Sequence, residues 1–173
     1  MKNEETTKPV VATVNKVQSV YSIMKKGSDY GVVPGCGSKP VLMKSGAEKL
    51  LLAFGLYAEV ATTKTDLEGN NREYDVKVSL ISRKTGEKVG EGVGLATTLE
   101  KKFKRDNPPD MFNTVLKMAK KRAMVDACLS SLAASSLFTQ DIIEVETEAE
   151  DFDVVAEAEA LKTYNENKNT EGK

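Results

Sequence analysis

Eight lysine and arginine side chains gather within 22 positions of the chain. They form two clusters, Lys101, Lys102, Lys104 and Arg105, followed by Lys117, Lys120, Lys121 and Arg122. Cations at this density neutralise phosphates without reading base sequence. Only a short break separates the clusters, so the pattern predicts that both line one groove that binds a nucleic-acid backbone. The alternative interpretation of the second cluster alone is an amphipathic helix with a solvated lysine face.

Other chemistry is limited by what the composition lacks. The chain has no histidine and two cysteines, Cys36 and Cys128, which excludes a four-ligand zinc site or a histidine-based catalytic pair within one chain. A disulfide framework is not expected, and a reducing compartment is the simple interpretation. Gly86-Glu87-Lys88 is too short to match a phosphate-binding loop. We therefore predict a binding protein that is not an enzyme, with no catalytic residue, cofactor or metal ligand.

A metal-dependent nuclease is the weaker alternative. It would have to use carboxylates near the expected strands, Asp66, Glu68, Asp75 and Glu91. Their spacing does not select a metal site.

Charge is unevenly distributed along the 173 residues, although the net charge is only −1. Residues 141–173 contain 11 acids and 3 bases and so carry −8, whereas residues 1–140 contain 22 bases and 15 acids and carry +7. A basic body with an acidic tail is typical of nucleic-acid proteins. The composition leaves open whether the tail only solubilises the protein or also competes with DNA.

Two further features bear on location. The longest apolar runs are far shorter than the ~20 residues that cross a bilayer. The first residues are polar and acidic, unlike a signal peptide. We therefore expect a cytoplasmic protein with no membrane partner.

The first half of the chain shows helical periodicity before it shows strands. Apolar positions from Val10 to Lys26 recur at helical spacing, and Gly27 ends this helix. Residues 27–44 are rich in glycine and proline and are expected to form a structured loop. A second helix is expected to begin with a capping box, Ser45 and Glu48, and to stop at Gly55.

A two-residue period then predicts three strands, over residues 57–66, 74–80 and 88–97. The turns between them are expected at 68–71 and 84–87. In the third strand, Val89, Val93 and Leu95 share one face, and Gly90, Gly92 and Gly94 fall on the other. A face almost without side chains indicates that a helix, another backbone or a ligand packs closely on it.

A long helix is expected from Asp110, as its cap, to about Ala133. It carries an apolar stripe of Phe112, Val115, Leu116, Ala119 and Ala123. Arg122 and Asp126 are four residues apart and could pair.

Together these elements predict an α+β fold. Its core is β-β-β-α, a three-stranded antiparallel meander packed on a long helix, with N-terminal helices before it. The expected divisions are a flexible N-terminus (1–9), an annealing and single-strand-binding domain (10–142) and an acidic, mostly disordered tail (143–173) with a possible short helix at 151–164.

The order of the motifs resembles a known family. Leu50 to Gly55 (Leu-x-x-x-Phe-Gly) leads into the meander. The meander ends in Val89-Gly90-Glu91-Gly92-Val93-Gly94, and Lys121-Arg122-Ala123 follows on the long helix. This resembles the single-strand annealing proteins of the Rad fifty-two-like superfamily, phage and prophage recombinases included. Asp29 to Pro34, Lys44 to Leu50 and Asn113 to Ala123 are also similar to phage proteins of this type, so the resemblance covers about residues 15–142.

The resemblance implies a ring or helical homo-oligomer that holds single-stranded DNA in a basic groove and anneals complementary strands without ATP. It implies that Lys121 and Arg122 touch the DNA backbone, whereas Val125 stands where the family often has another arginine. It also implies a phage or prophage protein in a bacterial host cell, with a single-strand-binding protein or an exonuclease as possible partners. The alternative is a phage-encoded interaction or inhibitor protein that uses the same fold to bind a protein.

One argument for an oligomer comes from the residues themselves. The glycine face and the broad apolar surface of the long helix are more than about 130 residues are expected to bury. We therefore expect a homo-oligomer of many subunits.

Overall fold

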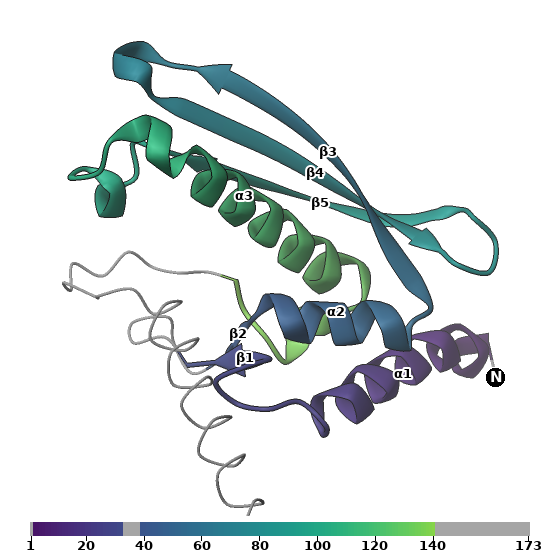
Figure 1. Cartoon of the computed structure of the whole chain (residues 1–173). Helices are drawn as coiled ribbons and strands as arrows, with labels where there is room; N and C mark the ends of the chain where they lie inside the picture. Colours follow the sequence, from purple (N-terminus) through teal and green to yellow (C-terminus); the bar gives the residue numbers. More distant parts are fainter. Residues whose placement is uncertain (1, 33–38, 141–173) are drawn as a thin grey trace, which may run out of the picture.

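The computed structural model describes residues 2–32 and 39–140. Within them the order of elements is helix, two short strands, helix, three long strands and a long helix, with short 3₁₀ helices after β3, after β5 and after the long helix (Figure 1). The α+β class, the antiparallel meander and its packing on a long helix are confirmed. The predicted tail and its short helix lie outside the described residues. No helix of the described part is long and apolar enough to cross a bilayer.

Strands β3 (Leu56–Asp66), β4 (Arg72–Ser82) and β5 (Lys88–Thr97) form the antiparallel sheet in the order β3-β4-β5. The period-two pattern predicted these strands because one face of β4 is buried through Tyr74, Val76, Val78 and Leu80, while Asp75 and Lys77 are exposed. Gly86, in the β4–β5 turn, has a φ of +73°, which glycine adopts without the strain that a side chain brings.

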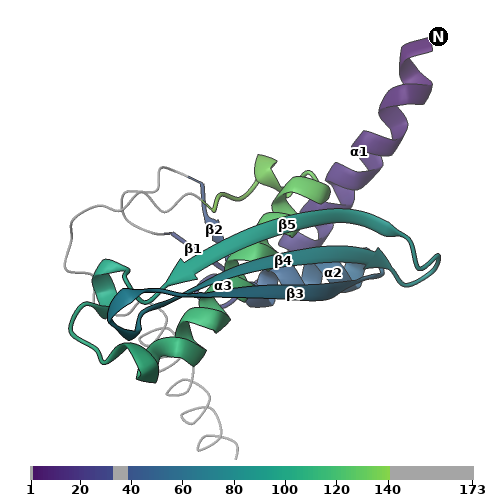
Figure 2. The same ribbon diagram turned by 90° about the horizontal axis from the view of Figure 1, so that it is seen from above.

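Helix α3 (Pro108–Ser131) covers the glycine face of β5, whereas no helix of residues 2–32 and 39–140 lies over the opposite face of the sheet (Figures 1 and 2). The expectation that Asp110 caps α3 is wrong. The cap is Asn107, two prolines occupy the first turn, and Asp110 lies inside that turn and accepts a hydrogen bond from the Asn107 side chain at 3.0 Å. Proline is favoured in a first turn because the N–H it lacks has no partner there.

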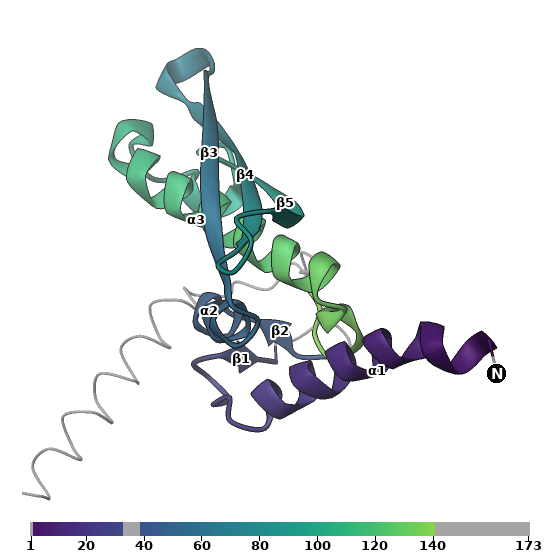
Figure 3. The same ribbon diagram turned by 90° about the vertical axis from the view of Figure 1, so that its right-hand side faces the viewer.

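Helix α1 (Lys2–Tyr21) lies beneath helix α2 (Lys44–Ala53), and its N-terminal end extends beyond the rest of the described chain (Figures 2 and 3). Its C-terminal part is anchored through Val17 and Val20. The predicted helix of residues 10–26 is therefore shifted: it begins before Pro9 and ends at Tyr21, after which the backbone turns toward Gly27 at a φ of +85°.

The loop before α2 contains two short strands, β1 (Tyr30–Gly31) and β2 (Val41–Leu42), which pair antiparallel. The predicted capping box is wrong, because Met43 is the N-cap residue of α2 and makes no side-chain cap bond. The Ser45 hydroxyl instead donates to the carbonyl oxygen of Ser28 in the preceding loop. At the other end of α2, Gly55 has the left-handed φ of +65° that a helix-terminating glycine adopts.

Candidate nucleic-acid interface

The contact between α3 and β5 fixes where every predicted cation of α3 points. A Cβ atom at Gly92 would overlap the backbone of Ala127, one at Gly94 the backbone of Ala123, and one at Gly90 the side chain of Ser131. Four helical residues rise about 6 Å, and two residues of an antiparallel strand span about 6.8 Å. The four-residue repeat of α3 therefore keeps step with the two-residue repeat of β5, and the helix lies directly on the strand.

The same match of repeats places polar side chains of α3 along the outer edge of β5. Arg122 donates to the carbonyl oxygen of Leu95 at 2.7 Å. Asp126, one turn on, accepts the backbone N–H of Val93 at 2.8 Å. An outer edge strand has backbone groups with no strand to pair with, and these two side chains supply partners for them.

Arg122 is consequently a structural residue. Besides Leu95, its guanidinium binds both carboxylate oxygens of Glu100, at 2.7 and 3.0 Å. The expected partner was Asp126, because the two are one turn apart. The structure corrects this: Glu100 is the carboxylate that pairs with Arg122, and Asp126 is committed to β5. Three hydrogen bonds therefore commit this guanidinium to the fold, although 37% of the side chain stays exposed.

The Glu100 carboxyl is a partly buried acid whose charge depends on this pairing. Burial raises its pKa, but hydrogen bonds from Arg122 and the charges of Arg122 and Lys102 lower it more, so the pKa lies below its usual range. Glu100 immediately precedes the 3₁₀ helix η2 (Lys101–Phe103). The Glu100–Arg122 pair therefore holds the first cluster of predicted cations near the second.

The eight predicted cations fall into three groups. Arg122 is committed to Glu100 and Leu95. Lys102 lies 3.9 Å from Glu100 and over the ring of Phe103, Lys101 is exposed, and Lys121 is half-buried. The remaining four have exposed side chains that make no hydrogen bond or ion pair with any described residue, and we call them the four outer cations: Lys104, Arg105, Lys117 and Lys120.

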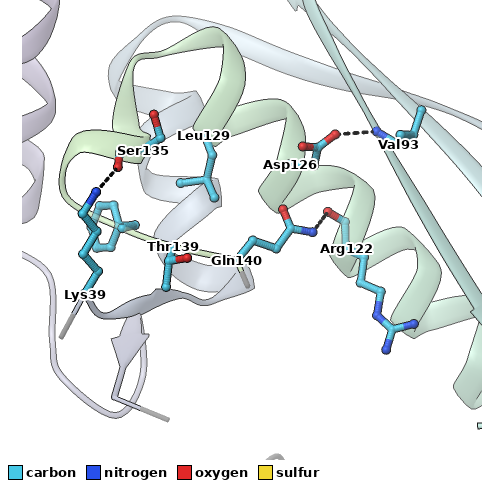
Figure 4. A pocket seen from close by; sticks show the side chains of 9 residues that line it. Lys39, Val93, Arg122, Asp126, Leu129, Ser135, Thr139 and Gln140 are labelled. Carbon is cyan, nitrogen blue, oxygen red and sulfur yellow. Dashed lines mark hydrogen bonds between the residues drawn. The ribbon is translucent and has the colours of Figure 1, made fainter. Parts of the chain in front are cut away.

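A hollow of about 720 Å³ lies beside the part of α3 that carries Arg122 and Asp126 (Figure 4). Residues of α3 line one side, among them Asp126 and Leu129, and Lys39, Thr139 and Gln140 line the other. Of the eight predicted cations only Arg122 borders it, and its guanidinium points away from Gln140 (Figure 4). The Gln140 side chain donates to the backbone carbonyl oxygen of Arg122 at 3.1 Å. The hollow is therefore not the predicted basic groove.

Asp29 and the residues around it join the loop before α2 to that helix. Asp29 is 1% exposed, accepts the backbone N–H of Lys25 at 2.8 Å and pairs with the ammonium of Lys49 on α2. Burial raises the pKa of this carboxyl, but the hydrogen bonds from Lys49 and Lys25 lower it more, so the pKa is lowered overall. A Cβ atom at Gly46 would overlap the carbonyl oxygen of Asp29. These residues fasten the loop to α2 and present no surface site.

Two of the four carboxylates of the nuclease alternative, Asp66 and Glu91, are paired with cations. Asp66 binds Arg72 at 2.6 Å, and Glu91 binds Lys77 at 2.9 Å as well as Lys88. The hydrogen bonds from Lys88 and then Lys77 lower the pKa of Glu91 to about 2. Among residues 2–32 and 39–140, no group of three His, Cys, Asp or Glu side chains is placed to hold a metal ion.

The remaining cysteine of the described part is inert. Burial raises the pKa of the Cys128 thiol to about 12, and thiol reactivity requires the thiolate. Cys36 lies outside the described residues.

Sequence reasoning missed Glu100 and the role of Asp126. A signal for Asp126 was present, because the spacing of Arg122 and Asp126 equals that of Ala119, Ala123 and Ala127 on the same helix, which face the glycines of β5. No comparable signal marks Glu100, because its partner is 22 residues away on another element. The chain matches none of the known protein-family models, and the search of curated proteins also finds no match.

Proposed function

We propose that the protein binds single-stranded DNA through the four outer cations and, as a homo-oligomer, pairs complementary strands without ATP. The observation that carries this proposal is that Lys104, Arg105, Lys117 and Lys120 are exposed and unpaired among the described residues and lie on α3 or within four residues before it. Annealing requires charge neutralisation and exposed bases but no bond chemistry. This agrees with a surface on which these four side chains form no ion pair with a described carboxylate.

The proposed contact is with the backbone of the strand. Lysine and arginine side chains on a flat, exposed surface bind phosphates with little preference for base sequence. The chain has no tryptophan and only 6% aromatic residues, so stacking platforms of the kind that hold bases are few. Binding is therefore expected to depend strongly on salt and weakly on base sequence.

Two surfaces support the homo-oligomeric part of the proposal. The open face of the sheet exposes Val89, Val93 and Leu95, each at about half of its full area (50%, 59% and 48%). The projecting part of α1 exposes Val10 and Val11. Exposed apolar residues that are adjacent on one face are typical of protein interfaces. A phage or prophage recombinase in a bacterial cytoplasm, working beside a single-strand-binding protein or an exonuclease, is the context that the family resemblance suggests.

Binding of a labelled single strand at several salt concentrations tests the proposal. Changing the four outer cations to glutamine should weaken binding and flatten the log–log salt dependence by up to about 3, since each lost phosphate contact removes about 0.7. The matched control changes four exposed lysines of other elements, Lys8, Lys25, Lys26 and Lys84, to glutamine. It removes the same charge and should leave most of the slope. Equal losses in both variants would contradict a localised site.

Pairing and assembly need separate measurements. Energy transfer between dyes on two complementary strands should rise on adding the wild-type protein without ATP, and more slowly with the variant of the four outer cations. Light scattering should give a mass of several chains at micromolar concentration. A stable monomer that still binds DNA would leave the binding proposal standing and contradict the oligomer.

A further inference from the structure

The described chain ends at a fixed point beside Arg122 of α3. Phe138 is buried against Tyr21 and Tyr30. The N–H of Thr139 donates to the carbonyl oxygen of Pro40 at 2.9 Å, and Gln140 holds the carbonyl oxygen of Arg122 (Figure 4). The last described residue, Gln140, therefore lies next to the fourth turn of this helix.

Lys117 and Lys120 lie on the opposite side of α3 from Arg122, but their distances from this point along the helix axis are short. Lys120 and Lys117 lie two and five residues before Arg122, or about 3 and 7.5 Å along the helix axis. A chain of ten residues can span about 33 Å, which exceeds the full width of a helix with its side chains, about 10–12 Å. The first 11 residues after Gln140 include six acids: Asp141, Glu144, Glu146, Glu148, Glu150 and Asp151.

Charge complementarity selects the occupant of the four outer cations when no DNA is present. Residues 141–173 carry −8 and residues 1–140 carry +7. A segment tethered by a short linker acts at an effective concentration of order 1 mM, far above that of a second protein. A row of carboxylates resembles a single strand in presenting regularly repeated negative charge.

We propose that the acidic segment 141–173 binds the four outer cations of its own chain and competes there with single-stranded DNA. The identity of the displaced ligand rests on the proposed function, but the contact between the segment and the helix does not. The consequence is a threshold: DNA must displace the segment, so short or isolated strands are rejected and long strands with many phosphates are accepted. Salt weakens this competition, because the interaction is between exposed charges.

The first experiment needs no DNA. A carbodiimide joins lysine amines directly to carboxylates in contact, and mass spectrometry of the full-length protein maps the joined pairs. We expect links from Lys104, Lys117 or Lys120 to glutamates of the segment, within one chain as judged by mixing isotopically labelled and unlabelled protein. The absence of such links from these three lysines would overturn the inference.

The second experiment measures competition in the full-length protein. Changing Glu144, Glu146, Glu148, Glu150, Glu157 and Glu159 to glutamine brings the segment from −8 to −2, and changing the same six to aspartate is the charge-preserving control. We expect the glutamine variant to bind a labelled single strand several-fold more tightly than the wild type at low salt, with the difference vanishing at high salt, and the aspartate variant to match the wild type. Equal dissociation constants for all three proteins at both salt concentrations would overturn the competition.

The two experiments separate the two proposals. Links without any binding of the single strand would support the intramolecular contact and contradict the proposed function. Tight binding that neither charge variant alters, with no links, would support the proposed function and overturn the inference.

Discussion

Both sides of helix α3 carry basic residues, but those on one side bind the rest of the fold and those on the other do not. On the side beside the edge of β5, Arg122 binds Glu100 and the Leu95 carbonyl oxygen and is only 37% exposed. On the outer side, Lys117 and Lys120 are exposed and bond no described residue. Arg122 would be the first choice for a DNA contact on sequence grounds, but it serves the fold. The lesson is that a cation is free for a ligand only where the fold has not already used it.

The largest effect is expected on the sheet side of α3. Changing Gly92 to valine places side-chain atoms where the backbone of Ala127 lies, so the helix must move off the strand. We expect a loss of about 3 kcal/mol in the free energy of unfolding, measured by urea denaturation. Val93→Ala, on the opposite face of the same strand, is the matched control and should change stability far less. A fully stable Gly92→Val protein would refute the close packing.

The next effect concerns Arg122. Its replacement by methionine keeps the length of the side chain but leaves the Glu100 carboxylate and the Leu95 carbonyl oxygen without this partner, which should cost about 2 kcal/mol. Thermal unfolding followed by circular dichroism measures it. If stability were unchanged while DNA binding fell, Arg122 would belong with the outer cations, and the contrast between the two sides of α3 would be wrong.

A smaller effect is expected from pH. The folded protein holds the pKa of Glu100 below its unfolded value. The stabilisation is therefore complete above the pKa of an unfolded glutamate, about 4.3, and is lost as the pH falls through the lower folded value. The difference in urea midpoint between the wild type and Glu100→Gln should be constant above about pH 5.5 and shrink below pH 4. A difference that grows on acidification would reverse the assigned sign.

The smallest effect on stability is expected on the outer side. Lys117→Ala and Lys120→Ala remove no contact of the described chain, so each should change the free energy of unfolding by less than about 0.5 kcal/mol. The same two variants should lower the affinity for a single strand. A large loss of stability would mean that these lysines, like Arg122, are committed to the fold.

Local patterns determined much of the architecture from the sequence alone. The alternation of Tyr74, Val76, Val78 and Leu80 with polar residues marked a half-buried strand, and the strand of residues 88–97 has the predicted bounds. The glycines of β5 predicted a closely packed neighbour. These features can be predicted from the sequence because side-chain periodicity and glycine geometry depend on residues a few positions apart.

Other features depended on contacts between distant residues. Met43, not Ser45, is the cap of α2, and the Ser45 hydroxyl binds the Ser28 carbonyl oxygen, 17 residues away in the preceding loop. The helical i, i+4 spacing suggested Asp126 as the partner of Arg122. That spacing takes no account of other elements: Asp126 binds the N–H of Val93 at the sheet edge, and Arg122 binds the Glu100 carboxylate. Sequence spacing placed eight cations in two clusters, and only the tertiary structure separated Arg122 from the four outer cations. The physical reason is that a charged group pairs with the nearest partner in space, and its distance along the chain does not enter.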